Sequence, residues 1–306
     1  MSLPDKYLIV LLGPTGVGKT ELSLKLAKHF NTPIISCDSR QFYREMRIGT
    51  AFPTEWELSQ AQHYFIGHKS VTERYSCGMF ELEALDLLKQ IYLSNDFAIL
   101  VGGSGLYIDA LLNGIDDFPT PDPELRKMLQ QQLKTEGIES LRHQLKILDP
   151  EYYNQVDLKN PQRVLKAVEV CLQTGKTFSS FLTAPKKERP FIPLKIGLTR
   201  PREELYERIN KRVDQMIEQG LVDEVKQLVG FRNYNALNTV GYKEIFQYLD
   251  GEITLEQAIE LIKRNTRRYA KRQLTWWARD NEICWFNPDN QTEIIEYIER
   301  LCRTKN

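Results

Sequence analysis

The chain has 306 residues, of which 42% are hydrophobic, and its 41 lysine and arginine residues balance 41 aspartate and glutamate residues. This composition is typical of a folded globular protein and excludes a collagen-like or disordered chain. The apolar run at residues 7–12 is too short for a signal peptide or a membrane span, and no longer run follows it. The five cysteines are scattered and form no CxxC pair, so we expect a cytoplasmic protein that has no disulfide, no zinc site and no contact with a membrane.

The first predicted elements are a strand, a glycine-rich loop and a helix. An apolar run at 6–12 precedes GPTGVGKT at 13–20, and Leu22, Leu26 and Phe30 then follow at four-residue spacing. The loop fits the pattern GxxxxGK[ST], in which backbone N–H groups converge on phosphate oxygens at a helix N-terminus. Its expected phosphate-binding residues are Gly13, Pro14, Thr15, Gly16, Val17, Gly18, Lys19 and Thr20.

Two side chains of this loop have predicted chemical roles. Lys19 adds a positive charge, and the Thr20 hydroxyl can hold Mg²⁺. ATP is the default occupant of such a nucleotide-binding motif, but any diphosphate offers the same oxygens and charge. The loop alone therefore leaves the phosphorylated substrate open.

Two further apolar runs are predicted to be strands that end in polar residues. One, at 32–36, is followed by Asp38, and the other, at 97–101, by Gly102, Gly103 and Ser104. Strands that alternate with helices indicate a parallel sheet, with its functional loops at the carboxyl ends of the strands. Asp38 is then a candidate general base, or else it forms an Asx turn or a helix cap. Ser104 follows glycines that permit close approach of a ligand, or it belongs to a plain turn.

Proline-bearing breaks at 118–126 and 186–193 indicate the edges of an insertion. Between them the apolar residues show helical spacing and no strand-like run. We therefore predict a core at 1–117 and 191–306, interrupted by a helical insertion domain at 118–190. The predicted fold class is α/β: a P-loop NTPase-like parallel sheet core with helices on both faces, plus a helical insertion lobe.

A concentrated basic segment lies near the C-terminus. Residues 263–279 contain seven lysine or arginine residues and no acid. Arg264, Arg268 and Arg272 share one helical face, Arg267 and Lys271 lie beside them, and Trp276 and Trp277 follow. Basic and stacking groups together suit a structured RNA. The alternative is a solvated helix face with tryptophans in the core.

Seven segments together resemble the tRNA dimethylallyltransferase family, and the resemblance covers nearly the whole chain. They are GPTGVGKT (13–20), DSRQFYREMRIGTAFPT (38–54), VGGSGLYIDALL (101–112), DPELR (122–126), NPQRVLKAVEV (160–170), TVGYKEI (239–245) and AKRQLTWW (270–277). The resemblance implies transfer of a dimethylallyl group from dimethylallyl diphosphate to N6 of the adenosine 3′ of the anticodon, position 37, in tRNAs that read codons beginning with U. Diphosphate is released.

The resemblance also implies roles for individual residues. The phosphate loop holds the diphosphate of the prenyl donor, with Mg²⁺, and Asp38 accepts a proton from the exocyclic amine. Ser104, where the family usually has threonine, bonds the bridging oxygen or the target base. The pattern RxDxM places Arg212 near the diphosphate, with Arg208 as its competitor. The implied catalytic residues are thus Asp38, Ser104 and Arg212.

The implied partners are tRNA, through its anticodon stem-loop, and dimethylallyl diphosphate, with the protein as a monomer. The tRNA-binding positions are Asp38, Ser39, Arg40, Gln41, Ser104, Arg126, Gln162, Arg163, Val164, Leu165, Lys166, Asn238, Thr239, Val240, Gly241, Tyr242 and Lys243. The chain departs from the family at Lys166, where arginine is common, and at Phe52, where lysine is frequent. It also lacks the C-terminal zinc finger of eukaryotic members, which indicates a bacterial type.

Three other functions stay open on the sequence. An adenylate isopentenyltransferase has a similar core but prenylates a free nucleotide, and it has little use for the insertion or the basic helix. A small-molecule kinase would use the same loop with ATP, and Asp38 would deprotonate an alcohol. An RNA-binding module would only sense phosphate through a degenerate loop.

Overall fold

The structure is a computed structural model that describes residues 5–116, 118–182 and 187–303. It divides into two compact units, which we call the core unit (Met1–Leu112 with Arg189–Asn306) and the insertion unit (Asn113–Glu188). We expected the insertion at 118–190, so the division falls a few residues earlier in the chain at both ends. Residue 117, where the first part of the predicted core ends, and Lys186, where the second proline-bearing break begins, lie outside the described residues.

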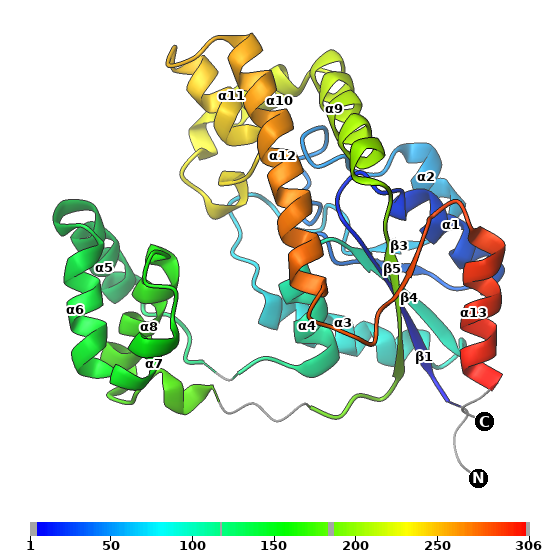
Figure 1. The fold of residues 1–306 in the computed structure, drawn as a ribbon, viewed down its shortest axis with the longest axis horizontal. Coiled ribbons are helices and arrows are strands. Elements are labelled where there is room, and N and C mark those ends of the chain that lie inside the picture. The colour runs from blue at the N-terminus through cyan, green and yellow to red at the C-terminus, as the bar shows by residue number, and fades with distance from the viewer. Residues whose placement is uncertain (1–4, 117, 183–186, 304–306) are drawn as a thin grey trace. The chain divides into compact units, whose positions relative to one another are not determined.

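The core unit contains a six-stranded parallel sheet in the order β3-β2-β4-β1-β5-β6 (Figure 1). The strands are β1 (Tyr7–Leu12), β2 (Ile34–Ser36), β3 (His63–Tyr64), β4 (Phe97–Gly102), β5 (Ile192–Leu198) and β6 (Cys284–Phe286). Alternate residues of β1 belong to two different hydrophobic clusters, one around Leu8 and Val10 and the other around Ile9 and Leu11. Both faces of the sheet are therefore covered, as expected for a parallel sheet, and the predicted α/β class is confirmed.

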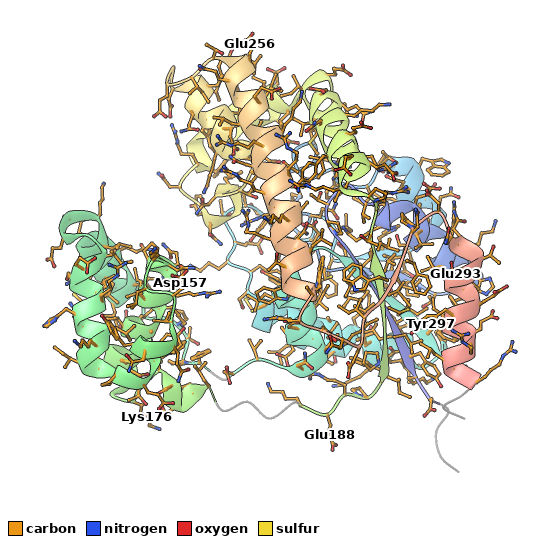
Figure 2. The ribbon with its side chains drawn as sticks, viewed as in Figure 1. Asp157, Lys176, Glu188, Glu256, Glu293 and Tyr297 are labelled. Atoms are coloured by element: carbon orange, nitrogen blue, oxygen red, sulfur yellow. The ribbon has the colours of Figure 1, made fainter. Side chains whose placement is uncertain are left out.

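The helices of the core unit are α1 (Lys19–His29), α2 (Glu55–Gln60), α3 (Cys77–Ile91), α4 (Gly105–Asn113), α9 (Arg202–Glu218), α10 (Leu221–Gln227), α11 (Tyr242–Leu249), α12 (Leu255–Trp277) and α13 (Gln291–Arg303). Short 3₁₀ turns lie at Val229–Phe231 and Asn235–Leu237. Thr254 and Gln257 form a capping box at the start of α12, and Glu256 adds a negative charge to its first turn (Figure 2). No helix within the described ranges is long and apolar enough to span a membrane.

The insertion unit consists of the helices α5 (Pro123–Glu136), α6 (Ile138–Leu148), α7 (Pro150–Gln155) and α8 (Pro161–Thr174), with a 3₁₀ turn at Ser179–Phe181. Asp122, Asp149 and Asn160 cap α5, α7 and α8, and each is followed by a proline in the first helical turn. Leu129, Leu145 and Val168 belong to a hydrophobic core of the unit's own. The predicted helical insertion lobe is therefore confirmed.

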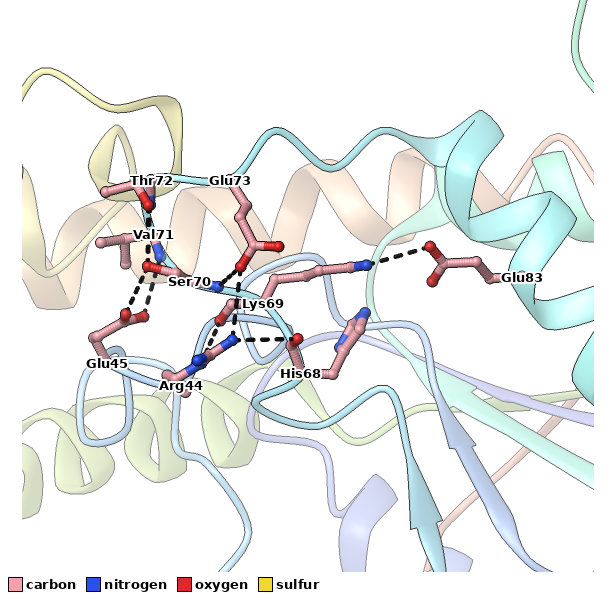
Figure 3. Close-up of polar contacts among 9 residues, drawn as sticks. All are labelled: Arg44, Glu45, His68, Lys69, Ser70, Val71, Thr72, Glu73 and Glu83. Atoms are coloured by element: carbon pink, nitrogen blue, oxygen red, sulfur yellow. Dashed lines mark hydrogen bonds and ion pairs between the residues drawn. The ribbon is translucent and has the colours of Figure 1, made fainter.

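An aromatic cluster at one side of the core unit encloses His68. The rings of Phe42, Phe65 and Tyr75 meet its imidazole edge-on at centroid distances of 5.5, 5.2 and 5.1 Å. Neither ring nitrogen has a hydrogen-bond partner among the described residues. Figure 3 shows Arg44 next to this segment, and its guanidinium donates to the carbonyl of His68 at 3.4 Å. Burial lowers the pKa of His68 from 6.5 to about 4, and the neighbouring Lys69 charge acts in the same direction.

Replacing His68 with phenylalanine should make stability less sensitive to acid. Between pH 6.5 and about 4 the unfolded chain binds a proton at His68 that the folded protein does not bind. The free energy of unfolding of the wild type therefore falls as the pH is lowered through this window, by up to about 1.4 kcal/mol per pH unit from this residue. Urea denaturation at a series of pH values measures the slope. An identical slope in His68→Phe would contradict the prediction.

Candidate active site

A cavity of about 670 Å³ opens in the core unit at the carboxyl ends of β1, β2 and β4. The phosphate loop, the turn after β2, the helices α9 and α12, and residues 239–241 all contribute to its wall. This is the edge of the sheet at which parallel α/β proteins bind ligands. The sequence placed the phosphate loop, Asp38 and the end of β4 at this edge, and the structure brings them to the same cavity or its rim.

The phosphate loop has a backbone that requires glycine. Gly13, Gly16 and Gly18 have φ angles of 155°, 82° and 116°, which other residues rarely adopt. A Cβ atom at Gly13 would also lie 2.9 Å from the carbonyl oxygen of Leu198. Because α1 begins directly after Gly18, the first N–H groups of the helix have no intrahelical acceptor. The loop and helix start therefore form an anion-binding site.

The Lys19 ammonium lies inside this loop. It donates to the carbonyl oxygens of Gly13 and Pro14 at 2.8 and 2.9 Å. Burial lowers its pKa to about 8; the charge of Arg212 acts in the same direction, and that of Asp38 opposes it. A bound anion would favour the charged ammonium.

Two arginines of α9 face the phosphate loop one helical turn apart. The Arg212 guanidinium lies 3.5 Å from the Thr15 hydroxyl, and burial lowers its pKa. Arg208 donates through Nε to the carbonyl of Gly16 at 2.9 Å. Both line the cavity, so α9 adds positive charge to the wall beside the loop. The structure thus places the predicted Arg212 and its competitor Arg208 at the same loop.

Asp38 takes part in the turn that follows β2. Its Oδ1 accepts the N–H of Arg40 at 3.0 Å, which forms an Asx turn. The residue nevertheless lines the cavity. The Asx turn and a role as base, which the sequence presented as alternatives, are therefore compatible.

Ser104 connects the end of β4 to the same turn. Its hydroxyl accepts the N–H of Ser39 at 2.9 Å and lies 3.1 Å from the Ser39 hydroxyl. The neighbouring Arg40 and Gln41 also make internal contacts: Arg40 donates to the carbonyls of Asn235 and Ala236, and Gln41 to those of Thr50 and Ala51. These bonds hold the turn rigidly beside the cavity.

Three positions expected to touch tRNA have fully buried side chains. Val164 and Leu165 belong to the hydrophobic core of the insertion unit. Tyr242 is 0% exposed, packs against Gly49 and donates its hydroxyl to Glu224 at 2.6 Å. Packing within the protein therefore occupies these three side chains, which leaves only the backbone of these positions for a contact with tRNA.

The other expected tRNA positions differ in their exposure. Arg126 and Lys166 pair with the buried Glu169 at 3.1 and 3.5 Å, so part of their charge is balanced within the unit. Exposed positions are Gln162, Arg163, Asn238 and Lys243. Thr239, Val240 and Gly241 line the cavity in the core unit.

Residues 263–277 of the basic segment belong to α12, and acids distant in sequence balance some of the segment's charge. Lys263 pairs with Asp214 and Arg279 with Asp109, both at 2.7 Å, while Arg267 donates to Asn210. Trp277 is 3% exposed and lies in the core, so a stacking role for it is wrong. Within residues 263–277 of α12, the exposed charged side chains are Arg264, Arg268, Lys271 and Arg272, which we call the basic face of α12.

Two supporting residues were not singled out in the sequence. Glu224 on α10 accepts the N–H groups of Arg47, Ile48 and Gly49 at 2.9, 2.7 and 3.0 Å. Gln273 on α12 contacts both the phosphate loop and Gly103. Each is one polar residue on an amphipathic helix, so its sequence spacing carries no information about these contacts.

A parallel sheet, a glycine-rich loop and a carboxylate at one cavity are typical of P-loop-like α/β enzymes. Residues 41–280 match the family model described as IPP transferase, and the chain belongs to this transferase family.

Curated relatives and solved structures agree with this family. The chain is 56% identical to tRNA dimethylallyltransferase 1 of Bacteroides thetaiotaomicron, over 95% of this chain and 94% of that protein. It is 53% identical to tRNA dimethylallyltransferase of Christiangramia forsetii, over 98% of this chain and 100% of that protein. The crystal structure of a tRNA isopentenylpyrophosphate transferase from Bacillus halodurans is 38% identical, with a TM-score of 0.73 and 98% coverage of both chains. A eukaryotic dimethylallyltransferase acting on tRNA is 29% identical, with a TM-score of 0.78, over 93% of this chain and 74% of that one.

Proposed function

We propose that this protein transfers a dimethylallyl group from dimethylallyl diphosphate to N6 of the adenosine 3′ of the anticodon, in tRNAs that read codons beginning with U. The proposal rests on one observation. The phosphate loop, the cationic side chains of Lys19, Arg208 and Arg212, and the carboxylate of Asp38 share one cavity. The names of the relatives support the same reaction. Diphosphate is the second product.

The phosphate loop holds the leaving group. Backbone N–H groups at the start of α1, the Lys19 ammonium and the Arg212 guanidinium all direct positive charge to the loop. Negative charge grows on the diphosphate oxygen as its bond to the allylic carbon breaks. Stabilising that charge in a partly enclosed site is the largest catalytic effect available to these residues.

Mg²⁺ fits this site through Thr20. The Thr20 side chain lies on the cavity wall, and hydroxyl and phosphate oxygens are ligands that Mg²⁺ prefers. The described residues contain no group of three or more His, Cys, Asp or Glu side chains that could hold a metal on its own. This agrees with an ion held by one protein oxygen together with substrate phosphates and water. When bound, the ion would neutralise charge on the diphosphate.

Asp38 acts on the acceptor. The adenine amine is a weak nucleophile, so it needs correct placement and removal of a proton. The N6 nitrogen forms a bond to the allylic carbon, the bond from that carbon to the diphosphate oxygen breaks, and the N6 proton moves to the Asp38 carboxylate. Ser104 is joined to the Asp38 turn through Ser39, and we propose that its hydroxyl orients the base or the bridging oxygen.

The basic face of α12 provides a surface for the RNA backbone. Replacing Lys271 and Arg272 with glutamine should weaken tRNA binding and lower the slope of log affinity against log salt by about one for each phosphate that is no longer neutralised. Filter binding at several salt concentrations measures this slope. Lys28→Gln, which removes an exposed lysine at the end of α1, is the matched control. An unchanged slope in the double variant would exclude this face from RNA binding.

We also propose that the protein acts as a monomer in the cytoplasm. Within the described residues, Cys37, Cys77, Cys171 and Cys284 form no disulfide, which agrees with a reducing compartment. Light scattering on the purified protein tests the monomeric state, because it measures the molar mass in solution.

The first experiment is transfer from labelled dimethylallyl diphosphate to unmodified tRNA, followed by nucleoside mass analysis. AMP and ADP serve as parallel acceptors and ATP as a parallel donor. Prenylated adenosine in tRNA alone is the expected result. Prenylated AMP or ADP would indicate a free-nucleotide enzyme, and label transferred only from ATP would indicate a kinase.

A further inference from the structure

One face of α12 contacts two loops of the active site. Tyr269, Gln273 and Trp276 follow one another at spacings of four and three residues and therefore lie on the same side of the helix. The Gln273 side chain is buried, with 5% exposure, although its amide is polar. Its two ends meet different loops: Oε1 accepts the N–H of Thr15 at 2.9 Å, and Nε2 donates to the carbonyl of Gly103 at 2.8 Å.

The loop around Ser104 is packed tightly against this face. A Cβ atom at Gly103 would lie 2.3 Å from Nε2 of Gln273, and one at Gly105 would lie 2.4 Å from the Trp276 ring. Trp276 also donates through Nε1 to Asp109 on α4 at 3.2 Å. The backbone on both sides of Ser104 is therefore placed by α12, at a separation that only glycine permits.

The phosphate loop is anchored at its beginning by the same side chain. The N–H of Thr15 is bound by Gln273, and the N–H of Val17 by the carbonyl of Pro14 at 3.3 Å. In the described residues the N–H groups of Gly16 and Gly18 make no such bond. Gln273 therefore binds the Thr15 N–H group, which could otherwise point toward phosphate. The N–H groups of Gly16 and Gly18 stay available to phosphate.

A single amide is suited to this double contact. The backbone of the phosphate loop offers a donor and that of Gly103 an acceptor, so the bridging group must both accept and donate. A glutamine side chain does both with a fixed distance between its oxygen and nitrogen. A buried amide that makes both bonds is also a stable arrangement, whereas one with an unmade bond is costly.

We propose that Gln273 is a positioning residue for prenyl transfer, which keeps the diphosphate loop and the Ser104 loop at one spacing. The inference rests on the proposed function, because the spacing matters only if a diphosphate and an acceptor base react between these loops. Reaction rates depend steeply on such placement, since a displacement of about 1 Å can cost about a hundredfold. Loss of the bridge should therefore lower kcat more than it changes the KM for tRNA.

Gln273→Glu and Gln273→Leu test the proposal in the full-length protein. Glutamate keeps the acceptor for Thr15 but, when ionised, has no donor for Gly103; leucine has neither group. In both variants we expect kcat at saturating substrates to fall by about tenfold or more, with the KM for tRNA changed less than about threefold. A protonated carboxyl group restores the donor, so the kcat of Gln273→Glu relative to wild type should rise as the pH is lowered.

Trp277→Phe is the matched control, since Trp277 lies in the core on the same helix and its Nε1 makes no hydrogen bond within the described residues. It should lower the melting temperature without the loss of kcat. Calorimetric titration with inorganic pyrophosphate independently measures the affinity of the phosphate loop for this anion. We expect weaker binding in Gln273→Leu but not in Trp277→Phe.

Wild-type kcat retained in folded Gln273→Leu, or a loss no greater than in Trp277→Phe, would overturn the proposal. A kcat ratio of Gln273→Glu to wild type that does not change with pH would also count against it. If the wild type itself transfers no prenyl group, the proposed function fails instead. The pyrophosphate titration would then still show whether Gln273 shapes the loop.

Discussion

Replacing Asp38 with asparagine should nearly abolish prenyl transfer and leave tRNA binding intact. The asparagine oxygen can accept the N–H of Arg40 as the aspartate oxygen does, so the Asx turn after β2 is retained. The amide cannot take up the N6 proton. We expect kcat to fall by about 10²- to 10⁴-fold, the usual contribution of general base catalysis. Single-turnover transfer of labelled prenyl groups measures the rate, and filter binding measures affinity for tRNA.

Asp38→Ala is the informative companion because it removes both the carboxylate and the turn contact. A loss in Asp38→Ala that is larger than in Asp38→Asn would measure the contribution of the turn. Thermal melting shows whether each variant is folded. If Asp38→Asn transfers the prenyl group at more than about a tenth of the wild-type rate, another group accepts the proton.

Replacing Lys19 with alanine should have a comparably large effect on use of the prenyl donor. The variant loses a positive charge within the phosphate loop and the two hydrogen bonds to the carbonyls of Gly13 and Pro14. We expect kcat/KM for dimethylallyl diphosphate to fall by about 10²-fold or more, because charge stabilisation of a leaving group is worth several kcal/mol. Steady-state kinetics at saturating tRNA measures this fall. A fall below about threefold would exclude Lys19 from the diphosphate site.

The lowered pKa of Lys19 adds a pH dependence with a definite sign. Its ammonium is fully charged well below pH 8 and loses its proton as the pH rises through about 8. An anionic ligand binds the charged form, so pyrophosphate affinity should decrease across this range. Lys19→Arg keeps its charge at these pH values and should show a smaller decrease. Equal decreases in both proteins would assign the effect to another group.

The sequence predicted the sheet best where a strand has a long apolar run. The six residues of β1 are all buried, and their run ends at a glycine loop with a distinctive spacing. The edge strands β3 and β6 have only two and three residues, and they were not predicted. Their pairing depends on the neighbouring strands β2 and β5, which lie far away in the chain.

For the site, the sequence predicted the residues that carry a local signature. Lys19, Asp38 and Ser104 each follow a strand at a loop, and parallel strands bring such loops to one edge. The sequence could not predict which side chains are buried or paired within the protein. Val164 and Leu165 are packed into a core, and Asp109 and Asp214 balance charges of the basic segment at 263–279.

By itself, the amino-acid sequence determined the α/β class, the phosphate loop, the helical insertion and the resemblance to a tRNA-modifying family. Each of these follows from hydrophobic periodicity or from a motif within a short stretch of chain. Only the tertiary structure decided which cations stay exposed on α12, how Glu224 holds residues 47–49 and how Gln273 bridges two loops. Such contacts join residues that are far apart in the chain, and their geometry is set when the helices pack on the sheet.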